Sequence, residues 1–309
     1  MRNLTKLIDQ IRKQTENEEV TEYTGIQDSE FIQYLNDAQY HLQAAIVHNH
    51  PNVFIAEKII DAVSDQEKYD LPTDCFLSNK VHNVEYSQSG NEEDFYVLQQ
   101  DTIKSRASGI NGYPARYIRR SGHILLAPEP QTGGKIRLNY VRRLNELTTR
   151  KGLVTTNTAI NSSSQFTIPF NDIDFNTDFN SINEADFICI VDKTGKSIVK
   201  NIEVVSANIN GVTCKAHTVE TGEVTTIPAG SYVLNGADVS SHSELDISVE
   251  RFLIAYASWK ILKRDSSVDS SEAMQELQLM QGEIVQSYAL ITDDVTYIPQ
   301  LNSWDDWSM

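Results

Sequence analysis

Residues 112–143 read GYPARYIRRSGHILLAPEPQTGGKIRLNYVRR, and this stretch predicts a three-stranded β-meander. The expected strands are residues 115–120, 123–127 and 135–143. In the last strand an apolar side chain alternates with a polar or charged one, and successive side chains of a strand point to opposite faces. We therefore expect one buried face and one that faces water. The side chains expected on the wet face of that strand are Lys135, Arg137 and Asn139.

The meander is basic, although the chain as a whole is acidic with a net charge of −17. Residues 101–150 contain ten Lys and Arg residues against three acidic ones, a net charge of +7 that leaves −24 for the rest. Such a chain is not expected to bind DNA tightly, because non-specific affinity comes mainly from neutralising phosphates. A basic region in an acidic chain instead predicts a charge-complementary contact with another protein. The arginines assigned to this contact, called the meander arginines, are Arg116, Arg119, Arg120, Arg142 and Arg143.

Tyr113, Tyr117 and Tyr140 lie among the meander arginines and leave two interpretations open. Tyrosines beside arginines can stack on the bases of a single-stranded nucleic acid. Alternatively, the tyrosines lie in the core of a half-buried sheet and the charged side chains lie on its opposite face. We favour the second interpretation, of which a protein-contacting surface is a special case.

Both ends of the chain are predicted to be helical. Residues 4–11 have the spacing of an amphipathic helix, and a stronger helix begins near Asp28, which can cap it. A third helix is expected from about Leu245 and is apolar all round, as buried helices are. A fourth follows Asp269 and Glu272, which are spaced like a capping box. We expect these helices to pack into one bundle.

A compositional boundary falls at Arg150, because the next arginine is Arg251 and the residues between are rich in Ser, Thr, Asn and β-branched types. Several short strand-like runs in this segment predict a small β-sandwich or barrel. The fold class is therefore α+β, a helical bundle with a β-meander and an inserted β domain. The expected domains are residues 1–149 (helices and meander), 150–244 (inserted β domain), 245–290 (C-terminal helices completing the bundle) and 291–309 (extended C-terminal arm).

No motif in the sequence indicates catalysis. Phosphate loops, dinucleotide-binding glycine patterns, zinc-protease helices and serine-nucleophile elbows are all missing from it. His48 and His50 lack a third metal ligand nearby. DIDFNTDFN, residues 172–180, resembles the start of a calcium loop but has Thr177 where the tight turn needs Gly. We expect no enzymatic activity, no metal and no cofactor.

The last residues, ITDDVTYIPQLNSWDDWSM, are aromatic and acidic and show neither helical nor strand periodicity. Large aromatic side chains dominate protein interfaces when they bury in a partner. We therefore predict that this arm binds a neighbouring protein. Its predicted contact residues are Tyr297, Trp304, Asp305, Asp306 and Trp307, with the two aspartates meeting basic residues. The alternative is an arm folded back on the chain's own helices.

The order of these segments along the chain is similar to that of a known protein family. Helices lead to YDLP and DCF, then to GYPARYIRRSGHILLAPEP, the strand KIRLNYVRRL and the buried helix ERFLIAYASWKIL. This order, and above all HILLAPEP and KIRLNY, resembles the head-to-tail adaptor proteins of short-tailed bacteriophages, also called connector or tail-tube A-like proteins. The resemblance covers residues 28–143 and 245–290. Residues 150–245 depart from the minimal pattern of those proteins.

The resemblance implies a structural virion protein of the neck or tail, made in the host cytoplasm. Such a protein is a ring subunit, typically one of twelve, that docks under the portal, extends the DNA channel and binds a downstream tail or nozzle protein. DNA would pass through without specific binding, because an acidic wall forms no phosphate contacts. A ring requires head-to-tail contacts between unlike surfaces. No apolar run approaches the ~20 residues of a membrane helix, so no membrane association is expected.

Two other functions stay open at this point. One is a tail or fibre-attachment protein in which residues 150–244 form the docking module. The other is a carbohydrate-binding or hydrolytic tail protein with its site in the same segment. Its phenylalanines fall in polar sequence without an obvious pair of acids, which is unlike a hydrolytic site.

Overall fold

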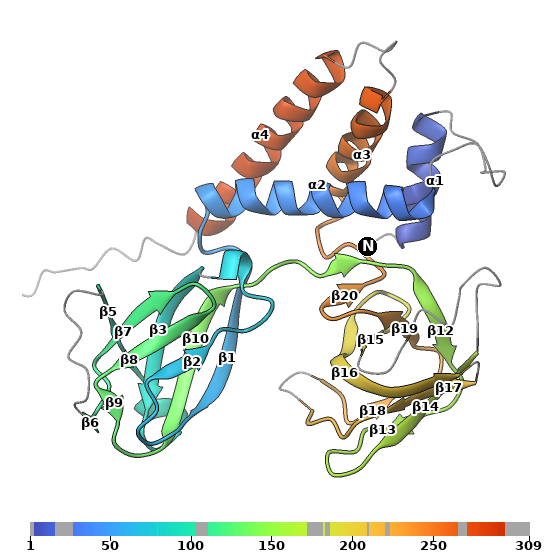
Figure 1. Cartoon of the computed structure of the whole chain (residues 1–309). Coiled ribbons are helices and arrows are strands. Elements are labelled where there is room, and N and C mark those ends of the chain that lie inside the picture. Colours follow the sequence, from blue (N-terminus) through green and yellow to red (C-terminus); the bar gives the residue numbers. More distant parts are fainter. Residues whose placement is uncertain are drawn as a thin grey trace, which may run out of the picture. The chain divides into compact units, whose positions relative to one another are not determined.

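The computed structural model describes residues 3–15, 27–78, 80–102, 111–171, 182, 186–208, 210–219, 223–264 and 271–293. The fold is mixed α+β, as predicted, and the chain divides into two compact units. The barrel unit consists of Met1–His41 and Leu144–Met280, and the sandwich unit consists of Leu42–Arg143 and Gln281–Met309. The helices of the described residues are α1 (Leu4–Gln14), α2 (Asp28–Asn49), α3 (Glu250–Arg264) and α4 (Ser271–Asp293) (Figure 1).

The sandwich unit contains two four-stranded sheets that share one core. The first has the order β1-β10-β3-β4, with β1 Ile55–Ala62, β10 Gly134–Val141, β3 Val81–Ser87 and β4 Tyr96–Val97. The second has the order β2-β8-β7-β5, with β2 Lys68–Asp70, β8 His123–Ala127, β7 Arg116–Arg120 and β5 Gln99–Asp101. Leu138 and Val84 of the first sheet belong to the same apolar cluster as Tyr117 and Ile124 of the second. The two sheets therefore pack face to face.

The predicted meander is correct in its first two strands and wrong in its third. β7 and β8 pair as an antiparallel hairpin, with Arg120 opposite His123. β10 leaves this sheet and becomes the centre of the other one, between β1 and β3. The alternation in its sequence determines which face is buried, but it does not determine the neighbouring strand. Short elements complete this unit: β6 Asn111–Gly112, which pairs with β9 Glu129–Pro130, and the 3-10 turns η1 Phe76–Ser78 and η2 Glu92–Asp94.

The barrel unit contains a closed six-stranded barrel, which confirms a barrel among the two forms predicted. The strand order is β12-β14-β17-β16-β15-β19. The strands are β12 Arg150–Val154, β14 Phe166–Asn171, β15 Phe187–Val191, β16 Ser197–Asn208, β17 Gly211–Cys214 and β19 Tyr232–Asn235. Gly152 is required by close approach, because a Cβ there would lie 2.4 Å from the ring of Phe170. Two small ribbons accompany the barrel: β13 Thr158–Ala159 with β18 Thr226–Ile227, and β11 Glu146–Leu147 with β20 Val239–Ser240.

The helices of the barrel unit contact one another through apolar and polar groups. The predicted apolar stripe of α1 is buried in full, and Ser258 of α3 donates a hydrogen bond to Gln14 Oε1 at 3.0 Å. The rings of His41 and Tyr256 lie 5.6 Å apart, which connects α2 to α3. α3 begins at Glu250 and not near Leu245, because Asp246 accepts the Ser248 N–H and forms a turn first. A single bundle of all four helices stays a prediction.

α2 carries polar side chains on its buried face, which the apolar stripe alone did not predict. In the barrel unit, Gln39 is fully buried and donates to the Asn145 carbonyl at 2.7 Å. Asn36 donates to the Leu147 carbonyl and accepts the Leu147 N–H, at 3.1 and 2.8 Å. In the sandwich unit, Gln43 donates to a main-chain carbonyl at 2.7 Å, that of residue 142. These amides satisfy main-chain groups that would otherwise be costly to bury.

The outer face of β10 is less exposed to water than predicted, as the surroundings of Arg137 show. Its side chain is only 14% exposed and donates to Glu85 Oε2 at 3.1 Å, with Glu57 3.7 Å away. Its guanidinium lies 3.9 Å from the centre of the Phe95 ring. Lys135, next on that face, pairs with Asp61. The charged residues of this strand are therefore largely engaged inside the unit.

We expect Arg137→Met to lower the free energy of unfolding by about 2–3 kcal/mol, because it leaves the Glu85 carboxylate without its cation on a covered surface. Arg116→Met is the matched control. Arg116 also pairs with one carboxylate, but its side chain is 52% exposed, so its loss should cost less than about 1 kcal/mol. Urea denaturation of both variants measures the difference. Equal losses of unfolding free energy in the two variants would show that the burial of Arg137 adds nothing to its contribution to stability.

His242 lies in a buried segment where the start of α1 meets the barrel unit. The Leu4 N–H donates to the Ser241 carbonyl at 3.0 Å, and Ser241 Oγ lies 2.9 Å from His242 Nδ1. Gly195, at φ +88°, turns against the imidazole so closely that a Cβ would lie 2.4 Å from it. Burial, and then the positive charge of Arg150, lower the pKa of His242 below its usual 6.5.

Because the folded chain holds this proton less tightly than the unfolded chain, stability should fall as the pH drops below about 6.5 and stay constant above it with respect to this group. We expect His242→Gln to remove that part of the pH dependence. Urea denaturation at pH 7.5 and pH 5.5 for both proteins measures it. The same loss of stability in the variant would assign the effect to other groups.

Candidate functional site

The meander arginines do not form one uniform surface. Arg116 and Arg119 of β7 are exposed, whereas Arg120 is half-buried. Arg116 lies at the start of β7 and pairs with Asp101 at 3.0 Å. Arg119 points to the other face and donates to the Val81 carbonyl at 3.1 Å. These two residues are the most exposed of the five.

Arg142 and Arg143 are half-buried and follow β10, where the main chain is bound to the segment around Cys75. The Arg143 N–H donates to the Asp74 carbonyl, and an isolated β-bridge joins Cys75 to Arg142. Tyr140 donates to the Asp74 carboxylate at 2.8 Å. Burial raises the pKa of the Cys75 thiol to about 11, so it stays protonated at neutral pH. The main chain of these two arginines therefore contributes to the fold, in addition to any contact that their side chains make with another protein.

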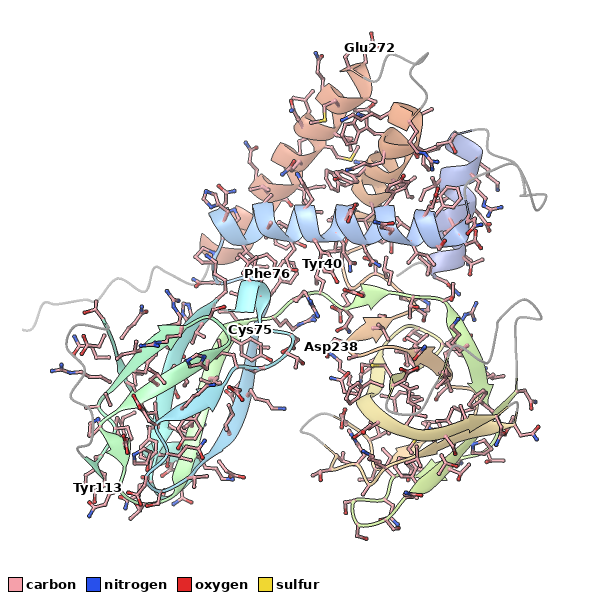
Figure 2. The ribbon with its side chains drawn as sticks, in the orientation of Figure 1. Tyr40, Cys75, Phe76, Tyr113, Asp238 and Glu272 are labelled. Carbon is pink, nitrogen blue, oxygen red and sulfur yellow. The ribbon has the colours of Figure 1, made fainter. Side chains whose placement is uncertain are left out.

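Of the three tyrosines, two are in the core and one is not. Tyr117 and Tyr140 are 3% and 4% exposed, in agreement with the favoured interpretation. Tyr113 is 64% exposed and contradicts it. It precedes β7, next to Pro114, and so lies outside the alternation that buries Tyr117. Figure 2 shows Cys75 and Tyr113 at opposite ends of the sandwich unit.

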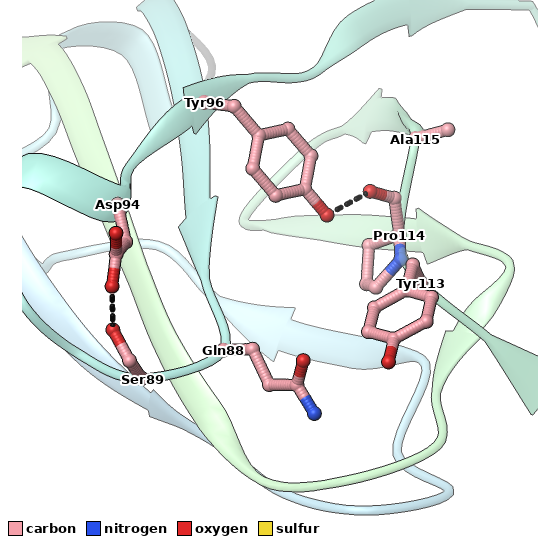
Figure 3. Close-up of a pocket in the computed structure, with 7 residues that line it drawn as sticks. All are labelled: Gln88, Ser89, Asp94, Tyr96, Tyr113, Pro114 and Ala115. Carbon is pink, nitrogen blue, oxygen red and sulfur yellow. Dashed lines mark hydrogen bonds between the residues drawn. The ribbon is translucent and has the colours of Figure 1, made fainter.

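Tyr113 lines a hollow that the sequence did not predict. The hollow has a volume of about 820 Å³ and is open to solvent (Figure 3). Tyr96 forms its wall and donates to the Pro114 carbonyl at 2.8 Å. Asp94, also in the wall, accepts a hydrogen bond from Ser89. The remaining lining residues are Gln88 and Ala115. The Gly-Tyr-Pro sequence at residues 112–114 was the available signal, because the residue before a proline is biased toward an extended or turn conformation.

The arm residues Tyr297, Trp304, Asp305, Asp306 and Trp307 lie outside the described residues, so their contacts stay predictions. The first residues assigned to the arm belong to α4, which continues to Asp293.

The described residues contain no group of three or more His, Cys, Asp and Glu side chains that could hold a metal ion. His50 Nε2 lies 3.0 Å from the Val285 carbonyl of α4, so one ring nitrogen of the predicted histidine pair is engaged in the fold. The calcium-like sequence at residues 172–180 lies outside the described part of the chain. None of the described helices is both long and apolar enough to cross a membrane.

Comparison with curated proteins gives no match. A family model described as SU10 adaptor protein matches residues 2–182, which is more than half of the chain. The match includes α1, α2, the strands of the sandwich unit and the first strands of the barrel. It therefore extends into residues 150–182, the first part of the predicted inserted domain. Adaptor proteins of this type are structural components of the phage particle. The chain belongs to the SU10 adaptor protein family, as the resemblance of its central segment to phage adaptors predicted.

Proposed function

We propose that this protein is a ring subunit of the head-to-tail connector, docks under the portal, extends the DNA channel and attaches the next tail component. The observation that carries this proposal is the family match over residues 2–182. Its partners are further copies of the chain, arranged in a ring of about twelve, the portal protein and a downstream tail or nozzle protein. The ring size follows only from the resemblance to other phage adaptors.

The charge distribution supports this role. The chain carries a net charge of −17, so DNA crossing a channel lined by it would meet repulsion and not phosphate contacts. Arg116 and Arg119 are exposed on β7 and are suited to acidic neighbours. The proposed role needs neither an enzymatic activity nor a cofactor.

The acidic aromatic arm is proposed to bind a neighbouring subunit or the portal. Trp304 and Trp307 would fill pockets, because tryptophan anchors contribute most to interface energies. Asp305 and Asp306 would meet basic residues of the partner. The meander arginines of an adjacent copy have the complementary charge.

Electron microscopy of the purified chain mixed with its portal protein tests the function. We expect a ring bound to the tail-facing end of the portal, with density for residues 294–309 on the neighbouring subunit or on the portal. A chain found only on fibres or at the distal end of the tail would contradict the connector role. A ring without arm density on a neighbour would contradict only the role of the arm.

Reversing the two exposed meander arginines together, Arg116→Glu with Arg119→Glu, should block incorporation into the portal complex. Each exposed ion pair is worth about 0–1 kcal/mol, so single reversals should have small effects. The matched control is Lys193→Glu with Lys215→Glu on the barrel, where both lysines are exposed. Co-sedimentation with the portal measures incorporation, and melting temperatures confirm folding. Normal incorporation of the β7 double variant would remove these arginines from the contact.

A further inference from the structure

Exposed apolar side chains stand at both edges of the first sheet of the sandwich unit. On the β1 edge, Ile55 and Ile59 are 41% and 42% exposed. On the β4 edge, Tyr96 and Val97 are 42% and 64% exposed. Most exposed apolar residues need no explanation, but edge strands that carry them are ready templates for pairing with another chain. The two edges therefore form a pair of surfaces that a partner would cover.

A row of side chains on the outer face connects the two edges across the sheet. Ile59 is opposite Arg137, Arg137 is opposite Glu85, and Glu85 is opposite Val97. Residues directly opposite one another share a face of the sheet. The row thus begins and ends with an exposed apolar side chain, one on each edge and both on the outer face.

The charged middle of this row is already satisfied. Arg137 donates to Glu85 at 3.1 Å and is covered by the ring of Phe95. Neither charge needs an external partner, whereas Ile59 and Val97 keep their apolar surface in water. A partner that continues the row would bury apolar surface at each end without breaking an ion pair.

A contact between two β1 edges is disfavoured by charge. Ile59 has Glu57 and Asp61 as neighbours on the same face of the strand, with side chains 51% and 78% exposed. An antiparallel pair of β1 strands centred on Ile59 would place Glu57 opposite Asp61 twice. Like charges directly opposite one another destabilise a sheet. Lys58, on the inner face, also opposes indiscriminate pairing, because charged inward-facing residues protect edges.

The β4 edge offers a better partner for the β1 edge. Phe95, which precedes Val97 at a spacing of two residues, carries no charge, and β4 ends at Val97. β1 and β2, which follow one another along the chain, are edge strands of the two sheets, and β4 and β5 are the opposite edges. Figure 1 shows β1 and β5 on opposite sides of the unit. The first side carries exposed Asp61 and the second carries exposed Arg116 nearby. Asp94, which lines the hollow beside β4, already accepts a hydrogen bond from Ser89.

We propose that the β1 edge of one copy contacts the β4 edge of the next copy, so that Ile59 packs against Val97 and the sheet rows continue from subunit to subunit. The partner is a second copy of this chain, because one molecule offers both halves of the contact on opposite edges of one sheet. A contact between unlike surfaces repeats from copy to copy and closes into a ring when the rotation permits. This inference rests on the proposed ring and identifies the surfaces that build it.

The test uses the full-length chain in phage particles that carry Ile59→Cys and Val97→Cys together. After gentle oxidation, a non-reducing gel should show covalent multimers larger than dimers, because each copy supplies one cysteine to each of two neighbours. The native cysteines, Cys75, Cys189 and Cys214, are buried and should not contribute. Each single-cysteine variant should stay monomeric. Dimers formed by Ile59→Cys alone would show that two β1 edges meet and would overturn the proposal.

An amine-reactive crosslinker applied to wild-type particles tests the proposed ring separately from the proposed edge contact. If it yields no multimers, the proposed ring is wrong. If it yields multimers while the double-cysteine variant yields none, the ring stands and the edge contact is wrong. Should the double-cysteine chain fail to enter particles, Ile59→Lys and Val97→Glu provide a second test. Each alone should block incorporation and the pair should restore it, whereas a pair no better than either single variant would overturn the contact.

Discussion

The double pairing of β10 is the constraint on which the sandwich unit depends. β10 pairs with β1 along eight residues and with β3 on its other side. In the described part of the chain, β1 is attached to its sheet through β10 alone. The buried side chains of β10, with Leu138 fully covered, hold the first sheet against the second. Strands from three separate parts of the sequence are thereby fixed relative to one another, and the edges with Ile59 and Val97 follow from that order.

Alternation in the sequence identified the strands and their buried faces, because side-chain direction is a local property of the backbone. It did not identify the partner of β10, because pairing depends on segments distant in sequence, here residues 55–62 and 81–87. The exposed position of Tyr113 was missed for a related reason. It looks like a strand tyrosine in the sequence, but it lies before β7, where alternation no longer applies.

The net charge of residues 101–150, the basic segment, is larger than the charge that is accessible on the folded protein. Lys135 is paired with Asp61, and Arg137 with Glu85. Both carboxylates come from residues outside the basic segment, so a charge count along the sequence could not find them. What stays available for contacts is a smaller set of groups on β7. The predicted assembly role consequently concerns two well-exposed arginines more than it concerns all five.

The amides on the buried face of α2 have a consequence for how this protein can evolve. Asn36 and Gln39 bind main-chain groups of Leu147 and Asn145, not their side chains. A contact of this kind specifies the path of the connecting segment and imposes no side-chain identity on it. Sequence drift there is limited by other neighbours and by the need for an amide hydrogen at residue 147, which a proline would lack. Divergent relatives could thus share this helix-to-backbone attachment while having little sequence in common along the segment that it holds.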